Sequence, residues 1–265
     1  MIVDSHCHLD FKDFSAQRDD VVARAKAAGV GVMVTISTRV KQFQQIAEII
    51  ERYDNVFGSV GTHPHHADEE LDVTAEHLIR LAEHPKVVAI GEAGLDYHYD
   101  NAPRPAQEQG FRTHISAARE TGLPLVIHAR EADDDMIRIL EEETGKGAFP
   151  AVLHCYSSGP ELARRGVDLG FYVSFSGILT FRNSQGVRDI AASVSADRLL
   201  VETDAPYLAP MPHRGKVNEP AYTVHTAAVL ADLRGWTPEE TARRTTENFA
   251  RLFTKVPRAA LGLAS

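Results

Sequence analysis

The stretch Ile2–Leu9, IVDSHCHL, stands almost at the start of the chain and has the pattern of a short buried β-strand. Because successive side chains of a strand point to opposite faces, His6 and His8 share one face and Cys7 occupies the other. Two imidazoles on one rigid strand end form a chelate for a transition metal. The pair is weak evidence by itself, since a histidine pair on a surface or in a core fits the same pattern.

Four further residues of ligand type each follow an apolar run. Repeated placement of such residues at the ends of expected strands is hard to obtain by accident. Together with the histidine pair, this regularity argues for a metal-dependent hydrolase. The four residues are Glu92 after 87–91, His128 after 124–127, His154 after 150–153 and Asp204 after 199–203.

Apolar strand-like runs alternate with amphipathic helical patterns along the chain. Short, almost continuously apolar strands separated by helices are typical of a parallel sheet. Eight such units in 265 residues predict an α/β fold, the (β/α)8 TIM-type barrel, with the metal site at the C-terminal ends of the strands. The expected strands are 2–8, 31–37, 56–61, 87–92, 124–128, 151–155, 171–176 and 199–203.

A doubly wound open sheet is the alternative architecture. It would leave the candidate ligands of the first and last strands far apart, whereas closure of a barrel brings them together. The loops after the strands would then build the site, and those at 62–73, 93–104 and 205–219 are long. The expected helices are 17–28, 39–53, 74–84, 105–121, 132–143, 158–168, 185–195, 220–234 and 238–253.

Length and composition indicate the class of protein. With 265 residues, of which 43% are hydrophobic and 25% charged, the chain is expected to form a single hydrolase domain over 1–265. No apolar run approaches the roughly 20 residues of a membrane span, and a strand beginning at Ile2 leaves no room for a signal peptide. Cys7 and Cys155 fit a reducing compartment and are expected to be small buried residues. These features predict a cytoplasmic protein without a membrane partner.

The net charge of −9 argues against a protein that wraps duplex DNA, because such proteins carry a basic stripe. If nucleic acid is the substrate, contact must be confined to a few phosphates or to a strand end. Three cationic residues are candidates for binding those phosphates. They are Arg130, two residues beyond His128, and Arg214 and Lys216 in the loop after the last strand.

A carboxylate can bridge two divalent cations, which a nitrogen ligand cannot do, and Glu92 is the natural bridge. Two cations beside one water lower its pKa and stabilise charge on the scissile group. Asp204 would orient that water and take its proton, so the catalytic roles fall on Asp204 and Glu92. No activated nucleophile and no glycine-rich phosphate loop stands out. The expected ligands are His6, His8 and Asp204 for one cation, His128 and His154 for the other, and Glu92 for both.

The simplest interpretation of several residues near the candidate ligands is that they support the site without binding the metals. Glu202 shares the strand face of Asp204 and is expected to be a buried acid behind the ligands. His63 is a candidate for contact with substrate or for support of the metals, with a plain loop histidine as the alternative. Asp96 is expected to shape the loop around Glu92, and His65 is expected to be exposed to solvent.

The motifs as a set resemble the TatD-related deoxyribonuclease family, within the amidohydrolase-like metal hydrolases, and are most similar to its YcfH-like subgroup. The resemblance covers nearly the whole chain and includes every candidate ligand. The matching stretches are DSHCHL (4–9), GEAGLDY (91–97), IHAR (127–130), LHCY (153–156), YVSFSG (172–177), VETDAPYL (201–208), PHRGK (212–216) and NFARLF (248–253).

The resemblance implies a (β/α)8 barrel with two divalent metal ions that hydrolyses DNA phosphodiesters from the 3′ end. The expected substrate is therefore DNA, single-stranded or at its ends, and the metals are Mg, Mn or Zn. A hydrolase of a small-molecule amide, lactone or phosphoester is the alternative, because the same ligands serve those reactions. A barrel that only binds is the third hypothesis, and the intact ligand set argues against it. The oligomeric state stays open, and a monomer is compatible with the sequence.

Overall fold

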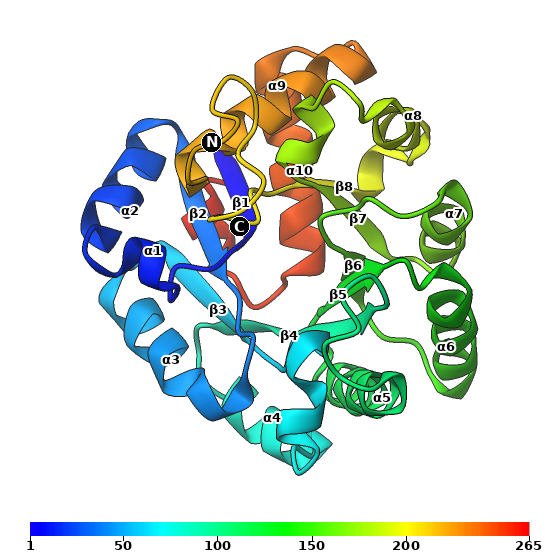
Figure 1. Cartoon of the computed structure of the whole chain (residues 1–265). Coiled ribbons are helices and arrows are strands. Elements are labelled where there is room, and N and C mark those ends of the chain that lie inside the picture. Colours follow the sequence, from blue (N-terminus) through cyan, green and yellow to red (C-terminus); the bar gives the residue numbers. More distant parts are fainter. Residues whose placement is uncertain (265) are drawn as a thin grey trace.

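Eight parallel β-strands, paired in their order along the chain, form the centre of the computed structural model, which describes residues 1–264 (Figure 1). Helices and loops connect each strand to the next on the outside of the sheet (Figure 1). The strands are β1 (Ile2–Cys7), β2 (Val30–Thr35), β3 (Val56–Val60), β4 (Val87–Asp96), β5 (Leu125–Arg130), β6 (Ala151–Leu153), β7 (Tyr172–Phe175) and β8 (Leu199–Val201).

The sheet closes between β1 and the segment that follows β8. Cys7 forms a parallel bridge with Ala205. The amide of His8 donates to the carbonyl of Ala205 at 2.8 Å, and the amide of Asp204 donates to the carbonyl of His6 at 2.9 Å. These contacts join the first strand to the last, so the predicted α/β fold of the (β/α)8 TIM type is confirmed and the open sheet is excluded.

Helices form the outer layer of the barrel. The side chain of Thr237 accepts from the amide of Glu240 at 3.1 Å and so caps the last α-helix.

Within residues 1–264, no helix combines the length and the apolar character needed to cross a membrane. The α-helices are α1 (Lys12–Ser15), α2 (Arg18–Ala27), α3 (Phe43–Arg52), α4 (Ala75–Ala82), α5 (Arg104–Thr121), α6 (Asp133–Lys146), α7 (Pro160–Asp168), α8 (Gln185–Ser193), α9 (Thr223–Arg234) and α10 (Pro238–Leu252). Short 3-10 segments are η1 (Val40–Gln42), η2 (Pro64–Glu70), η3 (Gly177–Thr180), η4 (Ala196–Arg198), η5 (Pro220–Tyr222) and η6 (Arg258–Leu261).

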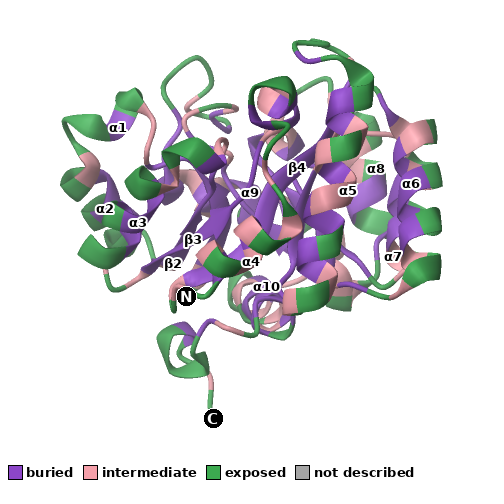
Figure 2. Cartoon of the chain, turned by 90° about the horizontal axis from the view of Figure 1, so that it is seen from below, coloured by how far each residue is buried: buried purple, intermediate pink, exposed green. Residues whose placement is uncertain are grey.

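The apolar core has two main parts. One joins strand residues such as Ile90 to helix residues such as Phe111. The other joins strand residues such as Val34 to Phe249 and Phe253 of α10. In Figure 2, α10 lies at the same end of the barrel as the N-terminus, which is the end where β1 begins. The amino ends of the strands are therefore covered by apolar packing, and the carboxyl ends are left for chemistry.

Strand β4 is longer than the sequence predicts and continues to Asp96 instead of ending at Glu92. The run GEAGLDY looks like a loop because it contains two glycines. In the structure it stays paired with β5, and Gly94 lies opposite His128. A Cβ on Gly94 would stand 1.9 Å from the carbonyl oxygen of His128, so the missing side chain permits the close approach of the two strands.

Strands β6 and β8 are shorter than expected, and the residues that follow them turn sharply. Cys155 and Asp204 adopt left-handed backbone conformations, with φ of 44° and 58°. Cys7 is fully buried as predicted, but Cys155 is only partly buried, and its prediction as a buried residue was wrong. The left-handed turn directs its thiol toward the hydroxyl of Ser176, 3.1 Å away, at the open end of the barrel.

Replacing Gly94 by alanine should destabilise the barrel by roughly 1–3 kcal/mol, because the new methyl group meets a strand backbone that cannot yield. Thermal unfolding followed by circular dichroism measures this as a lower Tm. Gly186→Ala is the control, since an added Cβ there meets nothing within 4 Å and the position is helical. Equal melting temperatures for the two variants would contradict the proposed contact.

Candidate metal centre

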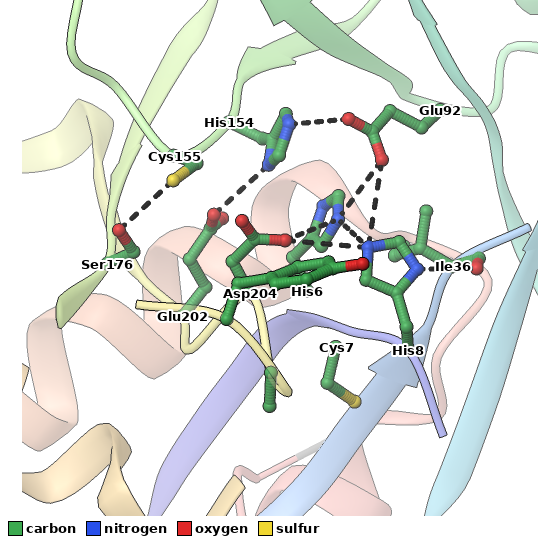
Figure 3. Close-up of polar contacts among 12 residues, drawn as sticks. His6, Cys7, His8, Ile36, Glu92, His154, Cys155, Ser176, Glu202 and Asp204 are labelled. Carbon is green, nitrogen blue, oxygen red and sulfur yellow. Dashed lines mark hydrogen bonds and ion pairs between the residues drawn. The ribbon is translucent and has the colours of Figure 1, made fainter. Parts of the chain in front are cut away.

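The six residues predicted as ligands converge at the carboxyl ends of the strands. They come from β1, β4 and β5 and from the residues that follow β1, β6 and β8, and all except His128 are labelled in Figure 3. Glu92 lies between the histidines, and each of its two oxygen atoms faces a different group of side chains (Figure 3). The six are His6, His8, Glu92, His128, His154 and Asp204.

The first group surrounds the Oε2 atom of Glu92. The Nε2 atoms of His6 and His8 are 3.2 Å apart. They lie 3.3 and 3.9 Å from Oε2 of Glu92, and 3.6 and 3.4 Å from Oδ1 of Asp204. Two nitrogens and two carboxylate oxygens therefore face one small volume, which is the donor set that divalent transition metals prefer.

The second group surrounds the other oxygen of Glu92. Its Oε1 atom is 2.9 Å from Nδ1 of His128 and 2.7 Å from Nε2 of His154. The Nε2 atom of His63 lies 3.5 Å from the same oxygen. His63 is thus part of the cluster, and its contact with substrate or support of the metals stays a prediction.

Hydrogen bonds behind two of the histidines determine which ring nitrogen faces the cluster with a lone pair. Nδ1 of His8 lies 3.1 Å from the carbonyl of Ile36, which can only accept, so this nitrogen carries the proton. Nδ1 of His154 donates in the same way to Oε1 of Glu202 at 3.1 Å. In the neutral rings both Nε2 atoms are then free to bind a cation.

Asp96 fixes the third ring. Its Oδ2 atom accepts from Nε2 of His128 at 3.0 Å and from Nε2 of His65 at 2.9 Å. Nδ1 of His128 is therefore the nitrogen that faces Glu92. The sequence placed Asp96 in a loop and His65 in solvent, and both placements were wrong because β4 extends to Asp96 and buries its carboxylate.

The charges of the cluster depend on one another. Burial opposes ionisation of Glu92, but the charges of His154 and His63 outweigh it and hold the pKa of that carboxyl well below its ordinary value. Burial would also lower the pKa of His8, but its hydrogen bond to Asp204 and the charge of Asp204 raise it to about 9. The carboxylates are thus ionised, and where no cation is bound they are balanced by protons on the histidines whose pKa is raised, namely His8, His128 and His154.

Two buried polar atoms near the cluster have no hydrogen-bond partner among the described residues, namely Nδ1 of His6 and Oε2 of Glu202. The His6 ring also stacks on His154, with ring centres 3.9 Å apart. Buried polar atoms are rarely left unpaired. The unpaired atoms and the converging nitrogen and carboxylate donors show that the cluster fits divalent cations. Three overlapping groups of side chains are each able to hold a cation. They are His6, His154 and Glu202; His6, His8 and Glu92; and His63, Glu92 and His128. Glu202 is buried behind the ligands, as the sequence predicts.

Two adjoining hollows open above the cluster and share several of its residues. The acidic lobe, defined by Glu131, Asp133, Asp134 and Asp135, also borders Cys155. The aromatic lobe, defined by Phe11, Tyr99 and Tyr207, borders the histidines of both groups. The residues common to both lobes are His128, Arg130, His154, Asp204 and Leu208.

Of the three predicted phosphate anchors, the structure brings Arg130 to the site. Arg130 lines both lobes, and its guanidinium lies 4.9 Å from the centre of the Tyr99 ring. The guanidinium of Arg214 instead lies 3.7 Å from the centre of the Phe181 ring. Arg214 and Lys216 are exposed and are not among the described residues that line the two lobes, so their binding of phosphate stays a prediction.

Sequence reasoning did not single out the aromatic residues of the aromatic lobe. Tyr207 stands within the motif VETDAPYL, and Phe11 and Tyr99 follow the motifs DSHCHL and GEAGLDY by two residues each. Their closeness to the ligands along the chain was the available signal. Aromatic residues are common in cores, however, so only the exposure of Tyr99 and Tyr207 and the position of all three in the hollow distinguish them.

Comparison with known proteins agrees with this geometry. A family model described as TatD related DNase matches residues 3–254. The protein named "Uncharacterized metal-dependent hydrolase YcfH" of Escherichia coli strain K12 is 46% identical over 257 residues, which cover 95% of each chain. The "3'-5' ssDNA/RNA exonuclease TatD" of Salmonella typhimurium is 34% identical over 255 residues, which cover 94% of this chain and 97% of that protein.

A solved structure extends the likeness to the fold. The crystal structure of YJJV, a TatD homologue from Escherichia coli K12, matches with a TM-score of 0.89 and 31% sequence identity, and the match covers 97% of this chain and 98% of that one. The family predicted from the motifs is therefore confirmed by the match along the chain. The chain belongs to the TatD-related DNase family and is a metal-dependent hydrolase.

Proposed function

We propose that the protein is a two-metal hydrolase that cleaves phosphodiester bonds in DNA, acting from the 3′ end on single strands or exposed ends. The observation that carries the two-metal part is the position of Glu92, whose Oε2 and Oε1 atoms face two separate groups of histidines. Two comparisons support the choice of substrate. The matching family is described as TatD related DNase, and one relative is named as a 3'-5' ssDNA/RNA exonuclease.

Each side chain has a defined part in this proposal. His6, His8 and Asp204 would hold one cation, His128 and His154 would hold the other, and Glu92 would contact both. When bound, the cations supply hydroxide from water at neutral pH and stabilise negative charge on the scissile phosphate. Mixed nitrogen and oxygen donors suit Zn or Mn, and Mg would bind more loosely.

Asp204 is suited to orient the attacking water and accept its proton. Its side chain is 16% exposed, whereas that of Glu92 is 2% exposed, so Asp204 is the more accessible ligand carboxylate, and it lines both lobes. Burial alone would raise the pKa of Asp204. Its hydrogen bond to His8 and the charges of the histidines outweigh burial and hold this pKa below its ordinary value, so the group is ionised. An ionised carboxylate at the mouth of the site is a ready proton acceptor.

Protein reconstituted with Mn or Zn and then desalted should contain about two equivalents of metal, because the ligands exceed the needs of one tetrahedral ion. Elemental analysis gives the ratio. Glu92→Gln should fall to one equivalent or fewer, whereas Glu69→Gln, on the exposed surface, should retain both. Full activity with a single equivalent would reject the bridged arrangement.

Metal binding should release protons and weaken as the pH falls. The pKa of His8 is raised to about 9 and that of His154 well above its ordinary value in the metal-free protein, so both rings are protonated at pH 7 and must lose a proton to bind. Calorimetric titration in two buffers of different ionisation enthalpy measures the release. Equal affinity at pH 6 and pH 8 would show that these rings are not ligands.

Asp204→Asn should retain the cation held by His128 and His154 but lose turnover by roughly 10²–10⁴. The assay uses metal-loaded protein with single- and double-stranded DNA labelled at either end, and shortening should begin at the 3′ end. Asp232→Asn, on the exposed face of α9, is the control. Absence of DNA cleavage together with rapid hydrolysis of a lactone or amide would replace the proposed substrate by a small molecule.

A further inference from the structure

Two tyrosines stand exposed on opposite sides of the aromatic lobe. Tyr99 follows β4 and is 54% exposed, and Tyr207 follows β8 and is 55% exposed. The two tyrosines thus come from loops after strands four places apart in the ring of eight, and both line the same hollow as the candidate ligands His8 and His154. Large aromatic side chains exposed beside a site mark a binding surface more often than a structural position.

The Tyr99 ring is held in place by three neighbours. The imidazole of His65 packs against it edge to face, with ring centres 5.3 Å apart, and His98 does the same at 4.8 Å. The guanidinium of Arg130 lies 4.9 Å from the ring centre. An oriented ring next to a cation is preorganised to receive a flat, electron-rich group that carries a phosphate.

The Tyr207 ring is supported from the other side of the lobe. Phe11 contacts it edge to face, with ring centres 6.0 Å apart, and Phe11 itself stacks on His8 at 4.7 Å. The amide of Tyr207 donates to the carbonyl of Asp204 at 2.9 Å. A continuous column of rings thus leads from a candidate metal ligand to the exposed tyrosine.

Charge limits what else can hold a nucleic acid here. The protein carries a net charge of −9, and the acidic lobe would repel a phosphate backbone. The aromatic lobe contains Lys12, Arg39 and Arg130 together with Asp10 and Asp13, and three carboxylates of the metal cluster also line it, so its side chains provide no excess of positive charge. Attraction in this lobe must therefore come mainly from uncharged contacts, and aromatic faces are the uncharged contacts that bases use.

We propose that Tyr99 and Tyr207 are stacking surfaces for unpaired bases next to the scissile phosphate, which makes them specificity-determining residues. This inference rests on the proposed function and adds to it the residues that would select a single-stranded end, whose bases are free of pairing partners. Stacking accepts every base, because each has a flat face, so cleavage should tolerate sequence but require unpaired bases. Arg130, beside Tyr99, would contact the adjoining phosphate.

The test compares two single-stranded oligonucleotides that differ only in the two nucleotides at the 3′ end, which carry bases in one and are abasic in the other. The measured quantity is the ratio of kcat/KM for the two substrates. The metal-loaded wild-type protein should prefer the base-bearing strand by about five- to a hundredfold. Tyr99→Ala and Tyr207→Ala should each reduce this ratio toward one.

The conservative variants separate stacking from other roles of the tyrosines. Tyr99→Phe and Tyr207→Phe keep the ring and should keep the ratio. Leu71→Ala, which removes an exposed apolar side chain outside the aromatic lobe, is the control and should match the wild type. Circular dichroism and Tm of each variant verify that it folds.

A binding measurement provides a readout that does not depend on turnover. In the metal-loaded Asp204→Asn background, a 3′-terminal 2-aminopurine should lose fluorescence on binding because stacking quenches it, and Tyr99→Ala or Tyr207→Ala should abolish that quenching. Retention of the kcat/KM ratio in both alanine variants, with DNA still cleaved, would overturn the stacking role alone. Hydrolysis of bis(4-nitrophenyl) phosphate without cleavage of either oligonucleotide would overturn the proposed nuclease function and this inference together.

Discussion

Closure of the barrel between β1 and the segment after β8 is the constraint on which the site depends. The hydrogen bonds from the amide of Asp204 to His6 and from the amide of His8 to Ala205 join the two ends of the sheet. The same residues supply ligand atoms, so one set of contacts both completes the fold and assembles half of the metal centre. A change that opened this seam would therefore remove the metal centre before it disturbed most of the core.

Both halves of the centre also depend on contacts behind the ligands. Ile36, Glu202 and Asp96 each accept a hydrogen bond from a ring nitrogen that points away from the cluster. These bonds select the tautomer of each histidine and hold the ring in position. Residues with a left-handed backbone also follow β5, β6 and β8, and Cys155 and Asp204 are two of them. Such strained positions are typical of functional sites.

Much of the site could be predicted because parallel strands end at a common edge. The ligands follow apolar runs, and that pattern alone located them at one end of the barrel. The support of His128 by Asp96 and the partial burial of His65 and of Cys155 could not be predicted in this way. Each depends on how far a strand continues or where a turn begins, and pairing with a neighbouring strand decides both.

The sequence by itself determined the order of strands and helices, the family and the identity of the candidate ligands, because these follow from local patterns of apolar and polar residues. Tertiary structure alone decided which oxygen of Glu92 faces which histidines, because that depends on strands brought together by closure. It also decided that Arg130 reaches the site while Arg214 packs on Phe181, and that Tyr99 and Tyr207 are exposed across from each other. The side chains of loops obey no period, so their positions follow only from the surfaces against which they pack.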